Sequence, residues 1–157
     1  MSKIAVLGTG SWATALSRVL IDNQNEIMMY GIDQEQIDDI NFNHQNEAFF
    51  HNISLESEIK ATNNLEEALM DMDYLLITIP TQFVKETLEQ VKPLIKKKIT
   101  VINAAKGFDL GTNMRMSDTI RSVLDENLIN PVVSLIGPSH AEEVVVRMLT
   151  TVCCFVR

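Results

Sequence analysis

The fold is decided at residues 4–13, which read IAVLGTGSWA. Four apolar residues predict a short strand, and the glycines after them predict a sharp turn into a helix. Gly8 lets the chain turn out of the strand, and Gly10 has no Cβ that would keep a phosphate away from the backbone. Ala13 stands where a third glycine often stands, and its small side chain still lets helix and strand pack closely. The stretch predicts the start of a βαβ unit that binds a dinucleotide, because the amides of the first helical turn then face its phosphates.

A glycine pair can also mark an ordinary tight turn, so the surroundings of this stretch matter. It begins almost at the N-terminus and follows a strand-like run. It also precedes apolar residues at helical spacing, which are Ala15, Leu16, Val19 and Leu20. These surroundings favour nucleotide binding over a plain turn.

Strand-like apolar runs alternate with helical patterns along the whole chain. The run at residues 74–79 is continuous and apolar, which is typical of a central strand covered on both faces, and the run at residues 59–62 is a short edge strand. The other predicted strands cover residues 3–7, 26–30, 99–102 and 132–136. Predicted helices cover residues 11–23, 34–41, 81–91 and 114–128, and a short helix follows the cap residue Asn64. This alternation predicts an α/β fold, namely a Rossmann-like, doubly wound, mostly parallel sheet with helices on both faces.

The length and charge of the chain limit its class. A length of 157 residues fits one domain, and 46% hydrophobic with 22% charged residues is ordinary for a soluble globular protein. The net charge of −8 argues against binding to nucleic acid. We interpret the lysine-rich residues 92–98 as a solvated helix end and loop, with nucleic-acid contact as the alternative. Because the sequence has neither a long apolar stretch nor a signal peptide, we expect no membrane insertion and a cytoplasmic location.

The cysteines and histidines do not have the spacing that is typical of metal ligands. Cys153 and Cys154 are adjacent, which makes them a poor disulfide pair, and they have no metal-ligand partners nearby. We interpret them as buried or incidental thiols in a reducing compartment. His44 and His51 lie in a polar, irregular stretch without ligand spacing, so we expect them at the surface and predict no metal site.

Three uncommon segments occur in a fixed order. They are GTGSWATAL at residues 8–16, NAAKGF at residues 103–108 and GPSHAEEV at residues 137–144. Together they resemble the bacterial NAD(P)-dependent glycerol-3-phosphate dehydrogenases. The resemblance covers essentially the whole chain, as the N-terminal, dinucleotide-binding domain of that family, so we assign residues 1–157 to that one domain.

The predicted cofactor site joins the glycine stretch to residues that the resemblance implies and to an acidic residue after the second strand. Its members are Gly8, Gly10, Ser11, Trp12, Ala13, Asp33, Lys106 and Ala141. The resemblance implies that Lys106, Gly137 and Ser139 contact the substrate, a small phosphorylated triose or glycerol. The resemblance also implies that His140 is not the proton shuttle.

Several of these residues have a second interpretation. Trp12 suits an ordinary core aromatic, and we favour a mixed role in which its ring also walls the pocket. Lys106 suits a solvated loop lysine, but it follows a buried strand between small residues that leave room for a ligand. Ser139 and Glu142 have the spacing of a capping box, which is compatible with substrate contact.

The cofactor preference rests on the end of the second predicted strand. Residues 30–33 read YGID, where the family typically carries a basic residue just after the glycine. Ile32 cannot bind a 2′-phosphate and Asp33 would repel one, so we predict NAD as the preferred cofactor, with NADP as the alternative. The other interpretation is that Asp33 only caps the following helix.

The family has a second, helical domain that carries its catalytic lysine, and the resemblance places that domain beyond Arg157. We therefore expect a domain truncated at its C-terminal end, with no catalytic residue of its own. The implied reaction converts dihydroxyacetone phosphate and NAD(P)H to sn-glycerol 3-phosphate, a glycerophospholipid precursor. We expect this chain to bind the cofactor with little turnover, and to self-associate or form a homodimer through the face left bare.

Two other functions stay open. The first is a non-catalytic NAD-binding module or truncated remnant. The second is another Rossmann dehydrogenase of the β-hydroxyacid or UDP-sugar type, against which the AAKG and GPSHAEEV segments argue.

Overall fold

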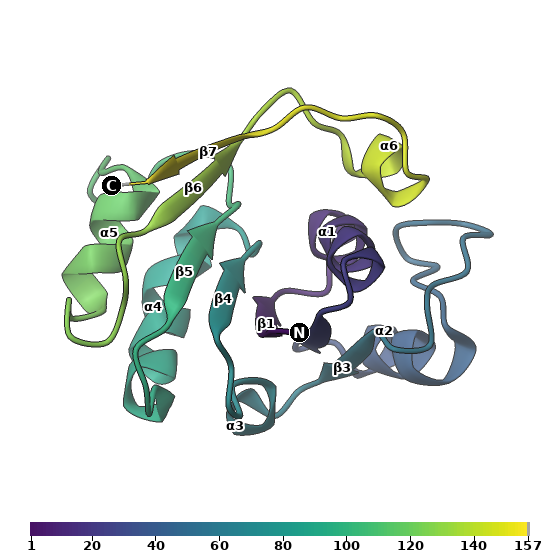
Figure 1. The fold of residues 1–157 in the computed structure, drawn as a ribbon, viewed down its shortest axis with the longest axis horizontal. Coiled ribbons are helices and arrows are strands. Elements are labelled where there is room, and N and C mark those ends of the chain that lie inside the picture. The colour runs from purple at the N-terminus through teal and green to yellow at the C-terminus, as the bar shows by residue number, and fades with distance from the viewer. Residues whose placement is uncertain (157) are drawn as a thin grey trace.

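The computed structural model describes residues 1–156 (Figure 1). Within them, seven strands form one sheet in the order β3-β2-β1-β4-β5-β6-β7. The first six are parallel, and β7 runs antiparallel to β6. The strands are β1 (Lys3–Leu7), β2 (Glu26–Tyr30), β3 (Lys60–Thr62), β4 (Tyr74–Ile77), β5 (Thr100–Asn103), β6 (Val133–Ile136) and β7 (Cys153–Val156). Because the order of the parallel strands is that of a doubly wound dinucleotide-binding sheet, the predicted fold class is confirmed.

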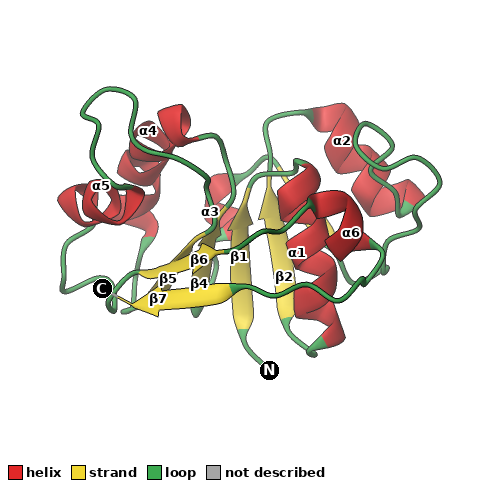
Figure 2. Cartoon of the chain, turned by 90° about the horizontal axis from the view of Figure 1, so that it is seen from above, coloured by secondary structure: helices red, strands yellow, loops and turns green. Residues whose placement is uncertain are grey.

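Helices cover both faces of the sheet, as Figure 2 shows from above. They are α1 (Ser11–Asp22), α2 (Gln34–Asp38), α3 (Leu65–Ala68), α4 (Thr81–Val91), α5 (Met116–Val123) and α6 (Ala141–Val145). A π-helix (Asp39–Asn43) follows α2, and a 3-10 helix (Lys92–Leu94) follows α4. Within residues 1–156, no helix combines the length and apolar character that crossing a bilayer requires.

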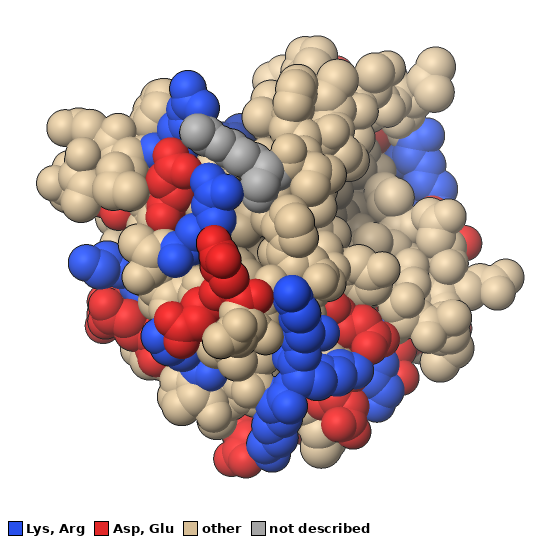
Figure 3. Space-filling view, turned by 60° about the vertical axis from the view of Figure 1, so that its left-hand side comes forward, with Lys and Arg blue, Asp and Glu red and all other residues tan. Residues whose placement is uncertain are grey.

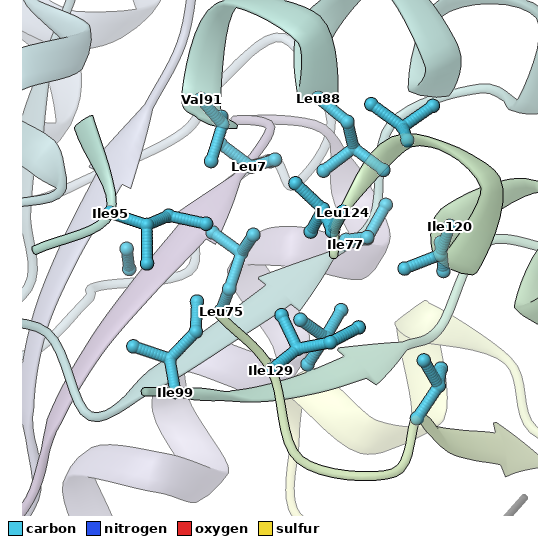
Figure 4. Packing of buried hydrophobic residues seen from close by; sticks show 14 of the residues in the cluster. Leu7, Leu75, Ile77, Leu88, Val91, Ile95, Ile99, Ile120, Leu124 and Ile129 are labelled. Atoms are coloured by element: carbon cyan, nitrogen blue, oxygen red, sulfur yellow. The ribbon is translucent and has the colours of Figure 1, made fainter. Parts of the chain in front are cut away.

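Alternate side chains of the central strands enter two separate cores. Leu7, Leu75 and Ile77 pack with Leu88 and Val91 of α4 on one face, where α5 also packs (Figure 4). The intervening strand residues, with Val6 among them, pack on the other face against α1 and α2. Each fully buried aliphatic side chain contributes about 1.5–3 kcal/mol relative to exposure. Because Leu75 and Ile77 of β4 enter one core and Leu76 enters the other, the predicted central strand covered on both faces is confirmed as β4.

The register brings the ends of the central strands to one edge of the sheet. Leu7 pairs with Tyr30 on one side and with Ile77 on the other, and Ile77 pairs with Asn103. The turns after β1, β2, β4 and β5 therefore lie side by side. In a sheet of this order, the edge formed by the carboxyl ends of the strands is where ligands bind.

Some predicted boundaries were wrong. The helix predicted at residues 114–128 is shorter, because Asn113 has a left-handed φ of 58° before it and Leu124 takes extended backbone at its end. The helix predicted at residues 34–41 ends at Asp38 and continues as the π-helix, which His44 ends with a φ of 54°. Polar side chains that bond the local backbone compete with a regular helix at such points.

The charged surface has both signs. On the face in Figure 3, Lys and Arg side chains are interspersed with Asp and Glu. Two lysines of the basic run form ion pairs, Lys92 with Asp125 at 3.1 Å and Lys97 with Asp73 at 2.6 Å. The run begins in the 3-10 helix and continues into an exposed loop, as interpreted from the sequence.

Candidate functional site

The turn after β1 needs glycine at its first position. Gly8 has a φ of +122°, and its amide donates to the carbonyl oxygen of Tyr30 at 2.8 Å. A Cβ at Gly8 would lie 2.8 Å from Thr78 Oγ1 and 3.3 Å from Ile79 Cγ2. Both the backbone angle and this contact exclude a side chain here. Gly8 thus lets the chain turn out of β1 while its backbone packs closely against the turn after β4.

The second glycine leaves space open above the start of α1. Gly10 is the N-cap of α1, and a Cβ there would meet only Phe49 Cζ, at 3.9 Å. Among the described residues, no side chain caps α1 and its first turn holds no acidic residue. The amides of Ser11, Trp12 and Ala13 have no carbonyl partner within the helix, so they can receive an anion. The start of α1 therefore fits the phosphates of a dinucleotide.

Asn46 supports the glycine turn from behind, a role that the sequence analysis missed. Asn46 is fully buried, and its Nδ2 donates to the Thr9 carbonyl and to Thr14 Oγ1, each at 2.8 Å. Thr14 Oγ1 in turn donates to the Gly10 carbonyl at 3.0 Å. A polar residue in an irregular stretch carries no sequence signal for this role, because only the fold brings it to the turn.

Lys106 follows β5 and points across the site. Its Nζ donates to the Ser139 carbonyl oxygen at 2.8 Å and lies 5.1 Å from the centroid of the Trp12 ring. The residue is exposed, so the ammonium remains accessible to a ligand. The cation over the ring and the bond to the backbone both fix the position of the charge.

Two hollows meet at these residues. The first, about 400 Å³, lies between the start of α1, the turn after β4 and α6. The second, about 480 Å³, lies between the ends of β5 and β6 and the start of α5. Both are lined by Trp12, Ala105, Lys106 and Ser139. The fold thus brings together predicted residues from three segments that are far apart in the sequence.

The turn after β6 forms the far wall of both hollows. Ser139 is only 4% exposed, and its Oγ makes a long contact of 3.4 Å with the Gly137 carbonyl. A Cβ at Gly137 would lie 2.8 Å from the Thr151 carbonyl, so glycine is required by packing. Ala141, the first residue of α6, lines the first hollow. The predicted capping box was wrong, because the N-cap of α6 is His140, with no cap bond from a described side chain.

Ala13 and Asp33 lie apart from the two hollows. Ala13 is buried and packs α1 onto the sheet. Asp33 follows β2 and caps α2, because its Oδ1 accepts from the amides of Glu35 at 3.0 Å and Gln36 at 3.4 Å. Asp33 also lines a hollow of about 560 Å³ together with Glu35, Asp38 and Asp39. The region after β2 is therefore acidic.

Two expectations about side-chain exposure were wrong in part. His51 is exposed beside Glu47 as expected, but His44, the residue that ends the π-helix, is half-buried. Cys153 and Cys154 are free and exposed, since the described residues cover neither face of β7. Residues 1–156 contain no cluster of three or more histidine, cysteine or acidic side chains that could hold a metal ion.

Comparisons with known proteins point to one family. The family model described as the N-terminus of NAD-dependent glycerol-3-phosphate dehydrogenase matches residues 3–156. A glycerol-3-phosphate dehydrogenase (NAD(P)+) of Streptococcus agalactiae serotype V is 44% identical over 150 residues, which are 96% of this chain and 44% of that protein. One of Bacillus cereus strain G9842 is 44% identical over 152 residues, which are 97% of this chain and 45% of that protein.

The solved structures agree with these relatives. The crystal structure of glycerol-3-phosphate dehydrogenase from Coxiella burnetii matches with a TM-score of 0.87 and 27% identity, over 98% of this chain and 46% of that one. A GDP-mannose dehydrogenase of Pseudomonas matches with a TM-score of 0.68 and 13% identity, which shows the fold alone. The chain spans less than half the length of the curated relatives named above.

Proposed function

Because the chain belongs to the NAD-dependent glycerol-3-phosphate dehydrogenase family, we propose that it is the cofactor-binding part of an enzyme that interconverts dihydroxyacetone phosphate and sn-glycerol 3-phosphate. The observation that carries the proposal is the position of Lys106. It stands at the junction of the two hollows, over Trp12 and bonded to the turn after β6. A cation at this junction faces a cofactor on one side and an anionic substrate on the other.

The cofactor in this proposal is NAD, held by residues of the first hollow and of the glycine turn. The open space above Gly10 and the amides of the first turn of α1 receive the pyrophosphate. Ser11 adds a hydroxyl, Trp12 walls the pocket, and Ala141 closes it from the side of α6. When bound, the nicotinamide supplies or accepts a hydride at the substrate carbon.

The substrate in this proposal lies in the second hollow, against Lys106, Gly137 and Ser139. Lys106 holds and orients the negatively charged substrate, and its fixed charge needs no reorganisation during the reaction. We assign no general acid or base to the described residues. The isolated chain therefore binds its ligands with turnover several orders of magnitude below that of a complete enzyme, because acid–base catalysis and positioning each supply large factors.

A cofactor titration tests the proposal. Purified chain is titrated calorimetrically with NADH and, separately, with NADPH. We expect NADH to bind more tightly, because Asp33 and the acidic side chains around it repel a 2′-phosphate. Equal or tighter binding of NADPH would contradict the NAD preference, and no binding of either cofactor would contradict the proposed site.

A turnover assay separates the enzyme from a non-catalytic module. NADH oxidation is followed with and without dihydroxyacetone phosphate, at high protein concentration. A weak rate that requires the substrate supports the dehydrogenase, and cofactor binding without any such rate supports a nucleotide-binding module. Near-normal turnover would contradict the expected loss. We propose a cytoplasmic location for the protein. Its proposed binding partner is the small phosphorylated substrate.

A further inference from the structure

On the side of α6, the wall of the first hollow is a short segment of chain. α6 has only five residues, Ala141–Val145, and an isolated helix of this length is unstable in water. The chain that follows it packs little, since Val146, Met148 and Leu149 are exposed. Side chains from other elements therefore decide where this wall stands.

Two cations bind backbone carbonyl groups at the two ends of this segment. Lys106 Nζ donates to the carbonyl oxygen of Ser139, just before α6, at 2.8 Å. Arg18 Nη1 donates to the carbonyl oxygen of Val145, the last residue of α6, at 2.6 Å. Because the last carbonyl groups of a helix have no partner within it, the bond from Arg18 satisfies one of them. The bond from Lys106 belongs to the site already described, and the bond from Arg18 lies outside it.

The guanidinium of Arg18 has a fixed direction. Arg18 is only 8% exposed, and its Nε and Nη2 donate to the two carboxylate oxygens of Glu56 at 3.0 and 2.8 Å. Arg147, just after α6, also donates to Glu56, at 2.6 Å. A guanidinium held by two parallel bonds is oriented as well as neutralised. Glu56 thus directs the remaining donor group of Arg18 at the end of α6.

α1 and α6 lie side by side (Figure 2), and both begin at the first hollow. Ser11 and Trp12 open α1 at this hollow, and Ala141 opens α6 there. Arg18 joins the two helices about two turns further along α1. Between them lies a small buried cluster, against which Trp12 packs, with the members Ala15, Phe50, Ala141, Val144 and Val145. A movement of α6 at Arg18 is therefore transmitted to Ala141 and to the ring of Trp12.

We propose that Arg18, paired with Glu56, is a positioning residue for the nicotinamide half of the cofactor, because it fixes α6 and with it one wall of the first hollow. The inference rests on the proposed function and adds to it a residue that lines neither hollow. Arg18 acts through the backbone of α6 and not through a contact with the cofactor.

The two halves of the cofactor depend on α6 to different degrees in this proposal. Asp33, which would face the ribose of the adenosine half, lies apart from the first hollow. That hollow is lined instead by the turns after β4 and β5 and by the start of α6. A displacement of α6 therefore disturbs the nicotinamide half and leaves the adenosine half in place.

Binding measurements on the whole chain test this inference. The wild type and an Arg18→Met variant are titrated with NADH and, separately, with ADP, which has the adenosine half and the pyrophosphate but no nicotinamide. Methionine keeps an apolar stem and removes the donors. We expect Arg18→Met to raise the dissociation constant of NADH about tenfold, the order expected for one hydrogen bond. The dissociation constant of ADP should change by less than about twofold, which is a few tenths of a kcal/mol.

Trp12 reports the position of the wall without any ligand. It is the single tryptophan of the chain, it is half-buried, and it packs against α6. Arg18→Met should shift its emission to longer wavelength, because a displaced α6 admits water to the ring. Circular dichroism sets a temperature at which the variant is fully folded. At that temperature, a role in stability alone would leave both the emission and the NADH affinity unchanged.

Arg121→Met is the matched control, because Arg121 also forms an ion pair, with Asp118, but lies on α5, which does not line the first hollow. It should leave both dissociation constants and the Trp12 emission unchanged. Glu56→Gln is a second variant, in which the amide oxygen still accepts one bond from Arg18. It should raise the dissociation constant of NADH by a smaller factor, and it replaces Arg18→Met in the comparison if that variant does not fold.

Equal NADH affinity in the wild type and Arg18→Met would overturn the inference, and so would an equal loss of affinity for NADH and for ADP. Failure of the wild type to bind NADH would overturn the proposed cofactor site instead. The emission of Trp12 then still decides the role of Arg18, because unchanged emission in Arg18→Met would show that Arg18 does not place the wall.

Discussion

Two glycines of the first turn serve different ends. Gly8 is required by the fold, because its φ is +122° and a Cβ would press on Thr78. Gly10 has ordinary extended backbone, with φ −72° and ψ −177°, and open space where a Cβ would stand. The first glycine is therefore required by the fold, and the proposed role of the second is to let a ligand approach the backbone.

Alanine at each position separates these roles. Gly8→Ala should destabilise the chain by about 1–3 kcal/mol, because alanine is strained at this φ and meets Thr78. Gly10→Ala should change stability by less than about 1 kcal/mol, while its Cβ occupies the space proposed for the pyrophosphate and weakens NADH binding. Thermal unfolding and NADH titration of both variants measure the two effects. Unchanged NADH affinity in Gly10→Ala would contradict the proposed place of the phosphates.

At the scale of elements, an ionic network fixes α6 against α1. Arg18 of α1 pairs with Glu56 at 2.8 Å and donates to the Val145 carbonyl of α6 at 2.6 Å. Arg147, just after α6, pairs with Glu56 at 2.6 Å and with Asp22 of α1 at 2.8 Å. The Arg18 guanidinium, joined by Arg147, lowers the pKa of Glu56 to about 2. The bond to Arg147 likewise lowers the pKa of Asp22.

This network predicts a dependence of stability on acid. Because the pKa of Glu56 is lower in the folded chain than its ordinary value of 4.5, its contribution is complete above pH 4.5 and is lost as the pH falls toward 2. The urea midpoint of the wild type should therefore fall more steeply over this range than that of Glu56→Gln. Parallel curves for the two proteins would show that Glu56 does not carry this effect.

At the scale of the whole molecule, the sheet ends on an uncovered strand. All four residues of β7 are exposed, with Phe155 at 61% and Val156 at 68%. Ile136 on the neighbouring β6 is also exposed. An apolar edge strand of this kind presents both unpaired backbone groups and apolar side chains to another chain.

We therefore predict that the chain self-associates through β7. Light scattering after gel filtration, with a reducing agent to keep Cys153 and Cys154 as thiols, should give a mass that rises with concentration. Phe155→Lys should lower that mass, because it places a charge on the edge. Phe42→Lys is the control, since Phe42 is also exposed but lies in the π-helix far along the chain. A monomer at every concentration would contradict the prediction.

The sequence by itself determined the fold class, the central strand, the edge strand at residues 59–62 and the glycine turn, whereas the other edge strand, β7, was not predicted. It could do so because these depend on local patterns, namely apolar runs, helical spacing and residues without a Cβ. The family segments at residues 8–16, 103–108 and 137–144 likewise marked where the carboxyl edge of the sheet would carry its candidate residues. Local patterning failed at the ends of helices, where Asn113 and His44 take left-handed backbone.

Only the tertiary structure decided how those candidate residues meet. It placed Lys106 over Trp12 and against the Ser139 carbonyl, buried Asn46 behind the glycine turn, and brought Arg18 to the end of α6. The physical reason is that these contacts join residues far apart along the chain, and their distances are set by the pairing of β1, β4, β5 and β6. No local pattern of residue types encodes such distances, because they arise when two helical layers and one sheet pack together.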